Sequence, residues 1–132
     1  MTTLNARAAV QARAAGAHAL TDVTGFGLLG HTHELAFASG LAAEVDAEAV
    51  PAIDGVLELL SDERALAGGS KRNRRDADEF TSWGPVDPRR ARLVCDAMTS
   101  GGLLAALPEG ASIDGWMVGR LVAGPRGALS VR

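Results

Sequence analysis

Apolar segments of two kinds alternate along this chain, and glycine residues separate them. Three longer segments have helical spacing or composition, at residues 5–15, 28–39 and 87–98, and a shorter helical stripe lies at 56–60. Strand-like segments lie between and after them, at residues 17–22, 41–46, 103–107, 116–124 and 127–132. Because strands and helices are interspersed rather than grouped, the pattern predicts an α/β or α+β fold.

Residues at the predicted helix ends support these boundaries. Gly16 and Gly40 follow the first two long segments, and glycine commonly ends a helix. Asp87 suits an N-cap and Pro88 the first helical position of the third segment. The predicted helices therefore have chemically sensible starts and stops.

Size and composition set further limits. The 132 residues fit one domain, 1–132, with one modest core. With three Phe, two Trp and no Tyr, that core must be built from Ala, Leu and Val. A net charge of −3 argues against a nucleic-acid partner bound through overall positive charge. No apolar run approaches the roughly 18 residues of a membrane span, so we expect no membrane partner.

Cys95 is the one cysteine of the chain. This count excludes a disulfide within the chain and argues against a zinc site built on cysteines. It suits a reducing compartment, and we expect a cytoplasmic location. Because Cys95 lies in the apolar pattern of residues 92–98, we interpret it as a buried small side chain rather than a nucleophile.

The middle of the chain differs in character. Residues 67–88 are polar, charged and interrupted by Gly and Pro, without apolar periodicity, and we predict a long surface loop there. Within it, residues 68–75 read GGSKRNRR. Exposed backbone N–H groups beside cations can hold phosphate, although the spacing is not that of a P-loop. A solvated basic loop is the alternative.

A second candidate site lies where the strand at 17–22 meets the helix at 28–39. Asp22 precedes Gly25 and Gly27, and carboxylate oxygens suit Mg²⁺ that also binds phosphate. The helix start adds unpaired N–H groups. A turn capped by Asp22 and its neighbouring threonines is the alternative, and spacing alone favours it. Residues 99–102, TSGG, likewise suit an ordinary turn.

The histidines do not form a metal site in this pattern. His31 and His33 are two positions apart, so a regular helix points them to nearly opposite faces. His18 is distant in sequence. We interpret all three as structural or surface residues, with His31 the one placed near the helix start.

Three motifs in order resemble one known family. They are AHALTDVTGFGLLGHTHE at 17–34, PAIDGVLELL with GGSKRN between 51 and 73, and CDAMTSGGLLAAL at 95–107. Together they resemble the C-terminal domain of selenophosphate synthetase (selenide, water dikinase), in the aminoimidazole ribonucleotide synthetase superfamily. The opening MTTLNARAA and the closing MVGRLVAGPRGALSV are similar to the same domain. The resemblance implies a layered sandwich in which helices cover a mixed sheet.

The resemblance also implies a reaction. In this family ATP, selenide and water yield selenophosphate, AMP and phosphate, with Mg²⁺, in a homodimer. It implies that Asp22 is a metal ligand and that ten residues contact the Mg–ATP: Thr24, Gly25, Gly68, Gly69, Ser70, Asn73, Thr99, Ser100, Gly101 and Gly102. The family's other carboxylates, its reactive Cys or selenocysteine and its essential Lys belong to an N-terminal domain that we expect to be missing here. Cys95 and Lys71 do not match those positions, so we expect no catalytic residue on this chain and no activity of the chain alone.

The sequence departs from the family pattern in two places. Ala97 and Met98 stand where the family commonly has Pro and Gln, which removes a polar group beside the turn. Residues 108–115 are too few for the helix that the family usually places there, since eight residues make barely two turns. We therefore predict a shortened segment or loop that leaves part of a sheet face less covered.

Two other functions stay open at this point. One is a sibling ATP-dependent enzyme of the superfamily, of the hydrogenase-maturation or thiamine-phosphate kinase type. The other is a non-catalytic, free-standing or decayed domain, which the shortened segment and the altered Ala97–Met98 turn favour.

Overall fold

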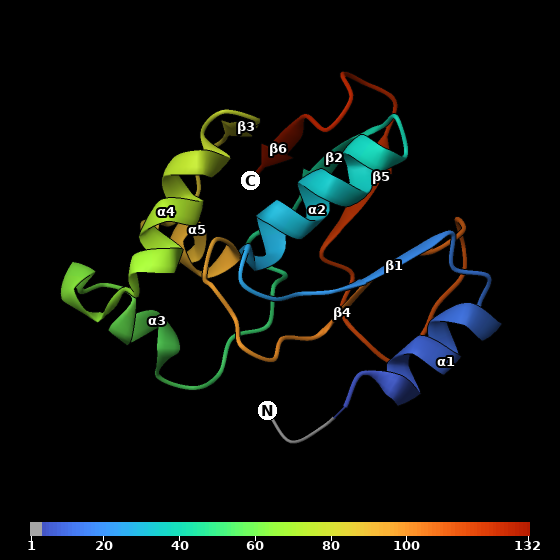
Figure 1. Cartoon of the computed structure of the whole chain (residues 1–132), viewed down its shortest axis with the longest axis horizontal. Coiled ribbons are helices and arrows are strands. Elements are labelled where there is room, and N and C mark those ends of the chain that lie inside the picture. The colour runs from blue at the N-terminus through green and yellow to red at the C-terminus, as the bar shows by residue number, and fades with distance from the viewer. Residues whose placement is uncertain (1–3) are drawn as a thin grey trace.

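The strands of this protein form two sheets, in a computed structural model that describes residues 4–132 (Figure 1). The helices are α1 (Ala6–Ala14), α2 (Gly27–Ala38), α3 (Val56–Leu59), the 3-10 helix η1 (Glu63–Ala65), α4 (Gly68–Ala77) and α5 (Pro88–Val94). The strands are β1 (Ala19–Asp22), β2 (Ala42–Val45), β3 (Thr81–Trp83), β4 (Leu103–Ala106), β5 (Gly119–Val122) and β6 (Leu129–Val131). The α/β class expected from the alternating pattern is confirmed.

The larger sheet is mixed, with the order β3-β6-β2-β5. β6 is parallel to both β2 and β3, whereas β5 is antiparallel to β2. α2 packs on β2 and lies across this sheet in Figure 1. β1 and β4 form a separate antiparallel pair, in which Asp22 lies opposite Leu103. The mixed sheet that the resemblance implied is present, and the β1–β4 pair lies beside it as a second, smaller sheet.

The core is built from small aliphatic side chains. Every buried hydrophobic residue among residues 4–132 is Ala, Val, Leu or Cys95, which confirms the expectation from the scarcity of aromatics. α2 contributes Leu28, Leu29 and Ala36, and Leu29 is only 1% exposed. This face of α2 is the one that helical spacing predicted.

The predicted long loop over 67–88 is wrong. α4 occupies Gly68–Ala77, and the edge strand β3 follows at Thr81–Trp83. Periodicity misses α4 because its buried residues are Ser70 and Ala77, so no apolar stripe marks the helix. β3 is three residues long and is stabilised by its pairing with β6.

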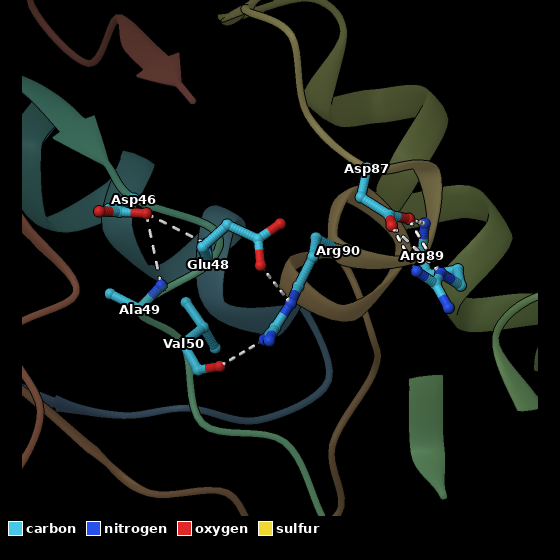
Figure 2. Close-up of polar contacts among 7 residues, drawn as sticks. All are labelled: Asp46, Glu48, Ala49, Val50, Asp87, Arg89 and Arg90. Carbon is cyan, nitrogen blue, oxygen red and sulfur yellow. Dashed lines mark hydrogen bonds and ion pairs between the residues drawn. The ribbon is translucent and has the colours of Figure 1, made fainter. Parts of the chain in front are cut away.

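α5 begins as predicted, and its first turn also holds a neighbouring segment in place. Asp87 accepts a hydrogen bond from the Arg89 backbone N–H at 2.8 Å, and Pro88 is the first helical residue. Arg90, the third residue of α5, donates to the Val50 carbonyl at 2.7 Å and pairs with Glu48 at 3.1 Å (Figure 2). The start of α5 therefore fixes the turn that follows β2.

Residues 107–118 contain neither helix nor strand, which confirms the loop predicted at 108–115, whereas the strand predicted from Trp116 begins only at Gly119. Trp116 and Met117 lie in this loop and are 72% and 87% exposed. None of the helices within residues 4–132 combines the length and apolarity that crossing a bilayer requires.

Candidate functional site

The turns at 22–26 and 98–102 lie side by side because β1 pairs with β4. The Val23 N–H donates to the Gly102 carbonyl at 2.9 Å, and the Gly101 N–H donates to the Val23 carbonyl at 3.2 Å. The Met98 N–H donates to the Thr24 carbonyl at 3.1 Å. Two of the predicted motifs thus form one continuous surface at the end of the small sheet.

Two glycines in these turns are required by close packing. A Cβ on Gly101 would lie 2.5 Å from the Val23 carbonyl oxygen. Gly27 has a φ of +71°, and its Cβ would lie 2.8 Å from the carbonyl carbon of Cys95. Both positions exclude larger side chains because backbone atoms already occupy the space.

Asp22 is exposed at the end of β1, and a residue from the start of α1 orients it. Asn5 Nδ2 donates to Asp22 Oδ1 at 2.7 Å and lies 3.2 Å from the Gly101 carbonyl oxygen. Sequence reasoning missed Asn5, whose only local signal is its position just before a helix. Asn5 therefore links the predicted metal ligand to the turn at 98–102.

Asp22 fits a magnesium site that is completed by other oxygen ligands. Mg²⁺ usually takes one or two protein carboxylates and fills its shell with water and phosphate oxygens. Within residues 4–132, no three His, Cys, Asp or Glu side chains are arranged to hold a metal ion. The role of Asp22 as a metal ligand stays a prediction.

His31 lies next to the site, and His33 lies elsewhere, as their spacing predicted. The Thr24 backbone N–H donates to His31 Nε2 at 2.9 Å, and the Thr24 hydroxyl is 3.0 Å from the same nitrogen. His33 instead contacts the Gly127 carbonyl at 2.8 Å and stacks on Phe80. The amide of Thr24 is therefore already used within the protein.

α4 brings the GGSKRN motif (68–73) to the same place, with Ser70 and Asn73 turned inward. Ser70 is 4% exposed; its hydroxyl donates to Asp96 Oδ1 at 2.5 Å and accepts from the Ala97 N–H at 3.1 Å. Asn73 Nδ2 donates to the carbonyls of Gly25 at 2.8 Å and Cys95 at 3.1 Å. Ser70 and Asn73 thus hold the surrounding loops.

The structure brings all three motifs together but divides the predicted site residues into two groups. Ser70, Asn73 and Gly101 make internal contacts, and a Cβ on Gly69 would lie 3.3 Å from Ala97. The exposed candidates are Asp22, Thr24, Gly25, Gly68, Thr99, Ser100 and Gly102. Their ligand roles stay predictions.

Cys95 is buried beneath the site and is 1% exposed. Burial raises the pKa of its thiol to about 12. Because the thiolate is the nucleophilic form, this cysteine is unreactive at neutral pH, as its apolar surroundings in the sequence indicated.

Residues 1–74 match the family described as AIR synthase related protein, C-terminal domain. The chain belongs to this family. It is 45% identical over 114 residues to the selenide, water dikinase of Escherichia coli K12, covering 83% of this chain and 31% of that protein. It is 46% identical over 93 residues to the Colwellia psychrerythraea selenide, water dikinase, covering 70% of this chain and 26% of that protein. The chain therefore spans less than a third of the length of these relatives.

Among solved structures, the chain is similar to the thiamine monophosphate kinase of Aquifex aeolicus. The TM-score is 0.48 at 19% sequence identity, and the match covers 87% of this chain and 31% of that one.

Proposed function

We propose that this chain is the C-terminal domain of a selenide, water dikinase and that it contributes Asp22 to the Mg–ATP site. The identity of 45% over 114 residues to the Escherichia coli K12 relative supports the enzyme class. The observation that carries the site is the exposed carboxylate of Asp22, held by Asn5 at the junction of the three motifs.

In this role Asp22 would hold Mg²⁺ together with phosphate oxygens of ATP. The ion would supply positive charge that offsets the charge developing on the phosphates. Asn5 donates to Oδ1, and no hydrogen bond among residues 4–132 engages Oδ2, which is the oxygen offered to the ion. The exposed turn residues Thr99 and Ser100 would add hydroxyl and backbone N–H donors to the phosphates.

Ser70 and Asn73 would act in this site by positioning rather than by touching phosphate. Their hydrogen-bonding groups contact Asp96, Ala97 and the Gly25 carbonyl. They would fix the shape of the turn that presents Asp22, and a fixed shape matters because phosphoryl transfer depends on positioning.

The rest of the reaction would belong to parts of the enzyme outside this chain. Groups that handle selenide would come from an N-terminal domain, and the complete enzyme would work as a cytoplasmic homodimer. This chain alone would then bind Mg–ATP weakly and would not turn it over.

One experiment tests the activity in a mixture. The N-terminal part of the Escherichia coli K12 relative is combined with this chain, and selenide-dependent AMP formation is measured. We expect no turnover by the chain alone and, in the mixture, a loss of roughly tenfold or more for Asp22→Asn. Asp114→Asn, on the exposed loop at 107–118, is the matched control. Turnover by the isolated chain, or equal rates for both variants, would contradict the proposal.

A second experiment tests the site on the chain alone. Mn²⁺–ATP is added during NMR, and the amide signals of residues near the ion are expected to broaden at 22–26 and 99–102. Asp22→Asn should remove this broadening. Broadening that is spread evenly over the surface, or that survives in Asp22→Asn, would place the metal elsewhere.

A non-catalytic domain is the second candidate function. The observation that favours it is that several donors of the motifs, including the Thr24 amide, are already used internally. Absence of Mg–ATP binding both alone and in the mixture would favour this role. Activity of the mixture with thiamine phosphate in place of selenide would instead indicate a sibling enzyme.

A further inference from the structure

A cleft lies between α4 and the segment that runs from β3 into α5. Its volume is about 570 Å³, within the range of small-molecule sites. Four residues of α4 line it, Ser70, Lys71, Arg74 and Arg75, and Asp78 lines it just after the end of the helix. Lys71, Arg74 and Arg75 occupy a face next to the buried one that carries Ser70 and Ala77.

The charge of this cleft is opposite in sign to that of the chain. Its lining carries four cationic side chains, which are Lys71, Arg74, Arg75 and Arg92, against the two carboxylates of Glu63 and Asp78. Asp76, just outside the lining, pairs with Arg75 at 3.2 Å, so the lining and this partner together carry a net charge of +1 in a chain with a net charge of −3. A concave basic surface of this kind attracts anions selectively.

Two of the guanidinium groups are held in fixed positions. Arg74 stacks over the Trp83 ring at 4.1 Å, and Asp78 contacts both Arg74 and the Trp83 Nε1 at 2.8 Å. Arg92 donates to the Leu60 carbonyl at 2.6 Å and pairs with Glu63 at 3.0 Å. Groups that are already ordered lose less entropy when a ligand binds.

Lys71 differs from these arginines. Its side chain makes no hydrogen bond or ion pair with any other residue in the range 4–132, and the residue is exposed. Its ammonium group is thus available to an incoming anion. The other walls are apolar and are formed by Leu66, Val86, Pro88 and Ala91 beside Trp83.

We propose that this cleft binds an organic phosphate, with the phosphate on Lys71 and the arginines and a flat apolar body against Trp83. A phosphate monoester is anionic at neutral pH and can pair with Lys71, the lining cation that has no carboxylate partner within residues 4–132. The apolar walls favour a nucleoside phosphate over inorganic phosphate. Ser70 lies between this cleft and the Asp22 site, whereas Lys71 and the arginines belong to the cleft alone, and binding there does not need a metal ion.

The test measures binding in EDTA, so that metal-dependent binding of nucleotide does not contribute. AMP, inorganic phosphate and adenosine are titrated by calorimetry and by the fluorescence of Trp83 in a Trp116→Phe background. We expect AMP to bind best, phosphate to bind more weakly and adenosine not to bind. Lys71→Met should weaken AMP binding roughly tenfold to a hundredfold, since a charge-assisted hydrogen bond is lost.

The matched control is Arg72→Met, because Arg72 is exposed on α4 and does not line the cleft. Because salt screens the charge of a residue outside the cleft, Arg72→Met should change AMP affinity by less than about twofold. Asp22→Asn should leave AMP binding in EDTA unchanged. A wrong assignment of the Mg–ATP site would therefore leave this result intact, whereas a wrong assignment of the cleft would abolish AMP binding in EDTA itself. The proposal is overturned by no AMP binding, by equal binding of adenosine, or by equal losses in Lys71→Met and Arg72→Met.

Discussion

Replacing Ser70 by Ala separates a structural role from a phosphate-binding role for the GGSKRN motif at 68–73. The sequence pattern made Ser70 a ligand candidate, but its hydroxyl is 2.5 Å from Asp96 Oδ1 and 3.1 Å from the Ala97 amide nitrogen. The residue is 4% exposed, so the alanine side chain leaves both partners with little access to replacement water. Ser70→Ala should therefore destabilise the protein.

The magnitude follows from the two hydrogen bonds. A bond to a charged group contributes about 1.5–3 kcal/mol and a neutral one about 0.5–1.5 kcal/mol. Asp96 is half-buried and regains part of its solvation in the variant, so we expect a loss near the lower end, about 2 kcal/mol. For 132 residues the entropy of unfolding converts this loss to a decrease of roughly 7 °C in Tm.

Urea unfolding followed by circular dichroism, with calorimetry in parallel, measures this change. Ser82→Ala on the exposed side of β3 is the control and should change stability by less than about 0.5 kcal/mol. Ser70→Thr keeps the hydroxyl and should retain more stability than the alanine variant. If Ser70→Ala unfolds at the same urea concentration as the unmodified protein, the hydrogen bonds do not carry the assigned energy. A loss of Mg–ATP affinity at unchanged stability would restore the phosphate-binding role.

Three further predictions concern other parts of the fold. Thr81 Oγ1 is buried without a hydrogen-bond partner, so Thr81→Val should raise the free energy of unfolding by about 1 kcal/mol in urea titrations; a decrease would show that the hydroxyl is satisfied. Gly27→Ala should cost more than about 2 kcal/mol by the same measurement, because φ is +71° and Cβ would overlap the Cys95 backbone; unchanged stability would refute the contact. The hydrogen bond from Arg89 lowers the pKa of Asp87 from 3.8 to about 2, so this pairing stabilises the folded state above pH 3.8 and is lost as the pH falls through 2. Thermal unfolding between pH 5 and pH 2 should show this loss, and Asp87→Asn, which caps α5 without ionising, should lack that part of the pH dependence.

Apolar spacing predicted those elements whose buried face is aliphatic. α2 and α5 were found because Leu29 and Val94 repeat at helical intervals with other buried side chains. α4 was missed because Ser70 and Ala77 alone form its buried face, and Ser70 packs there through hydrogen bonds. A pattern of hydrophobic residues cannot reveal a helix that packs through polar groups.

The site was less accessible to local reasoning than the fold. Asn5 and Asp22 are 17 residues apart, and Asn5 and Gly101 are 96 apart, so only the folded chain shows their contact. The three motifs occur in the order that is typical of the resembled family, and this resemblance indicated that they form one site. It did not indicate which polar side chains face outward and which face inward.

Some polar side chains of the three motifs face the interior and others face solvent. Only the groups that face solvent are able to contact a ligand. Four side chains hold the turns around Asp22: Asn5 at the N-cap of α1, His31 of α2, and Ser70 and Asn73 of α4. Each makes a hydrogen bond with Asp22, with the turn that follows it, or with the residues at the end of α5. Because these contacts approach the turns from different directions, the turns have few ways to move. In the sequence of the turns at 22–26 and 98–102, Asp22 is the one charged side chain. In the Mg²⁺ site that we propose, changes to the four positioning residues should therefore shift the position of the ion, whereas Asp22→Asn should remove its binding.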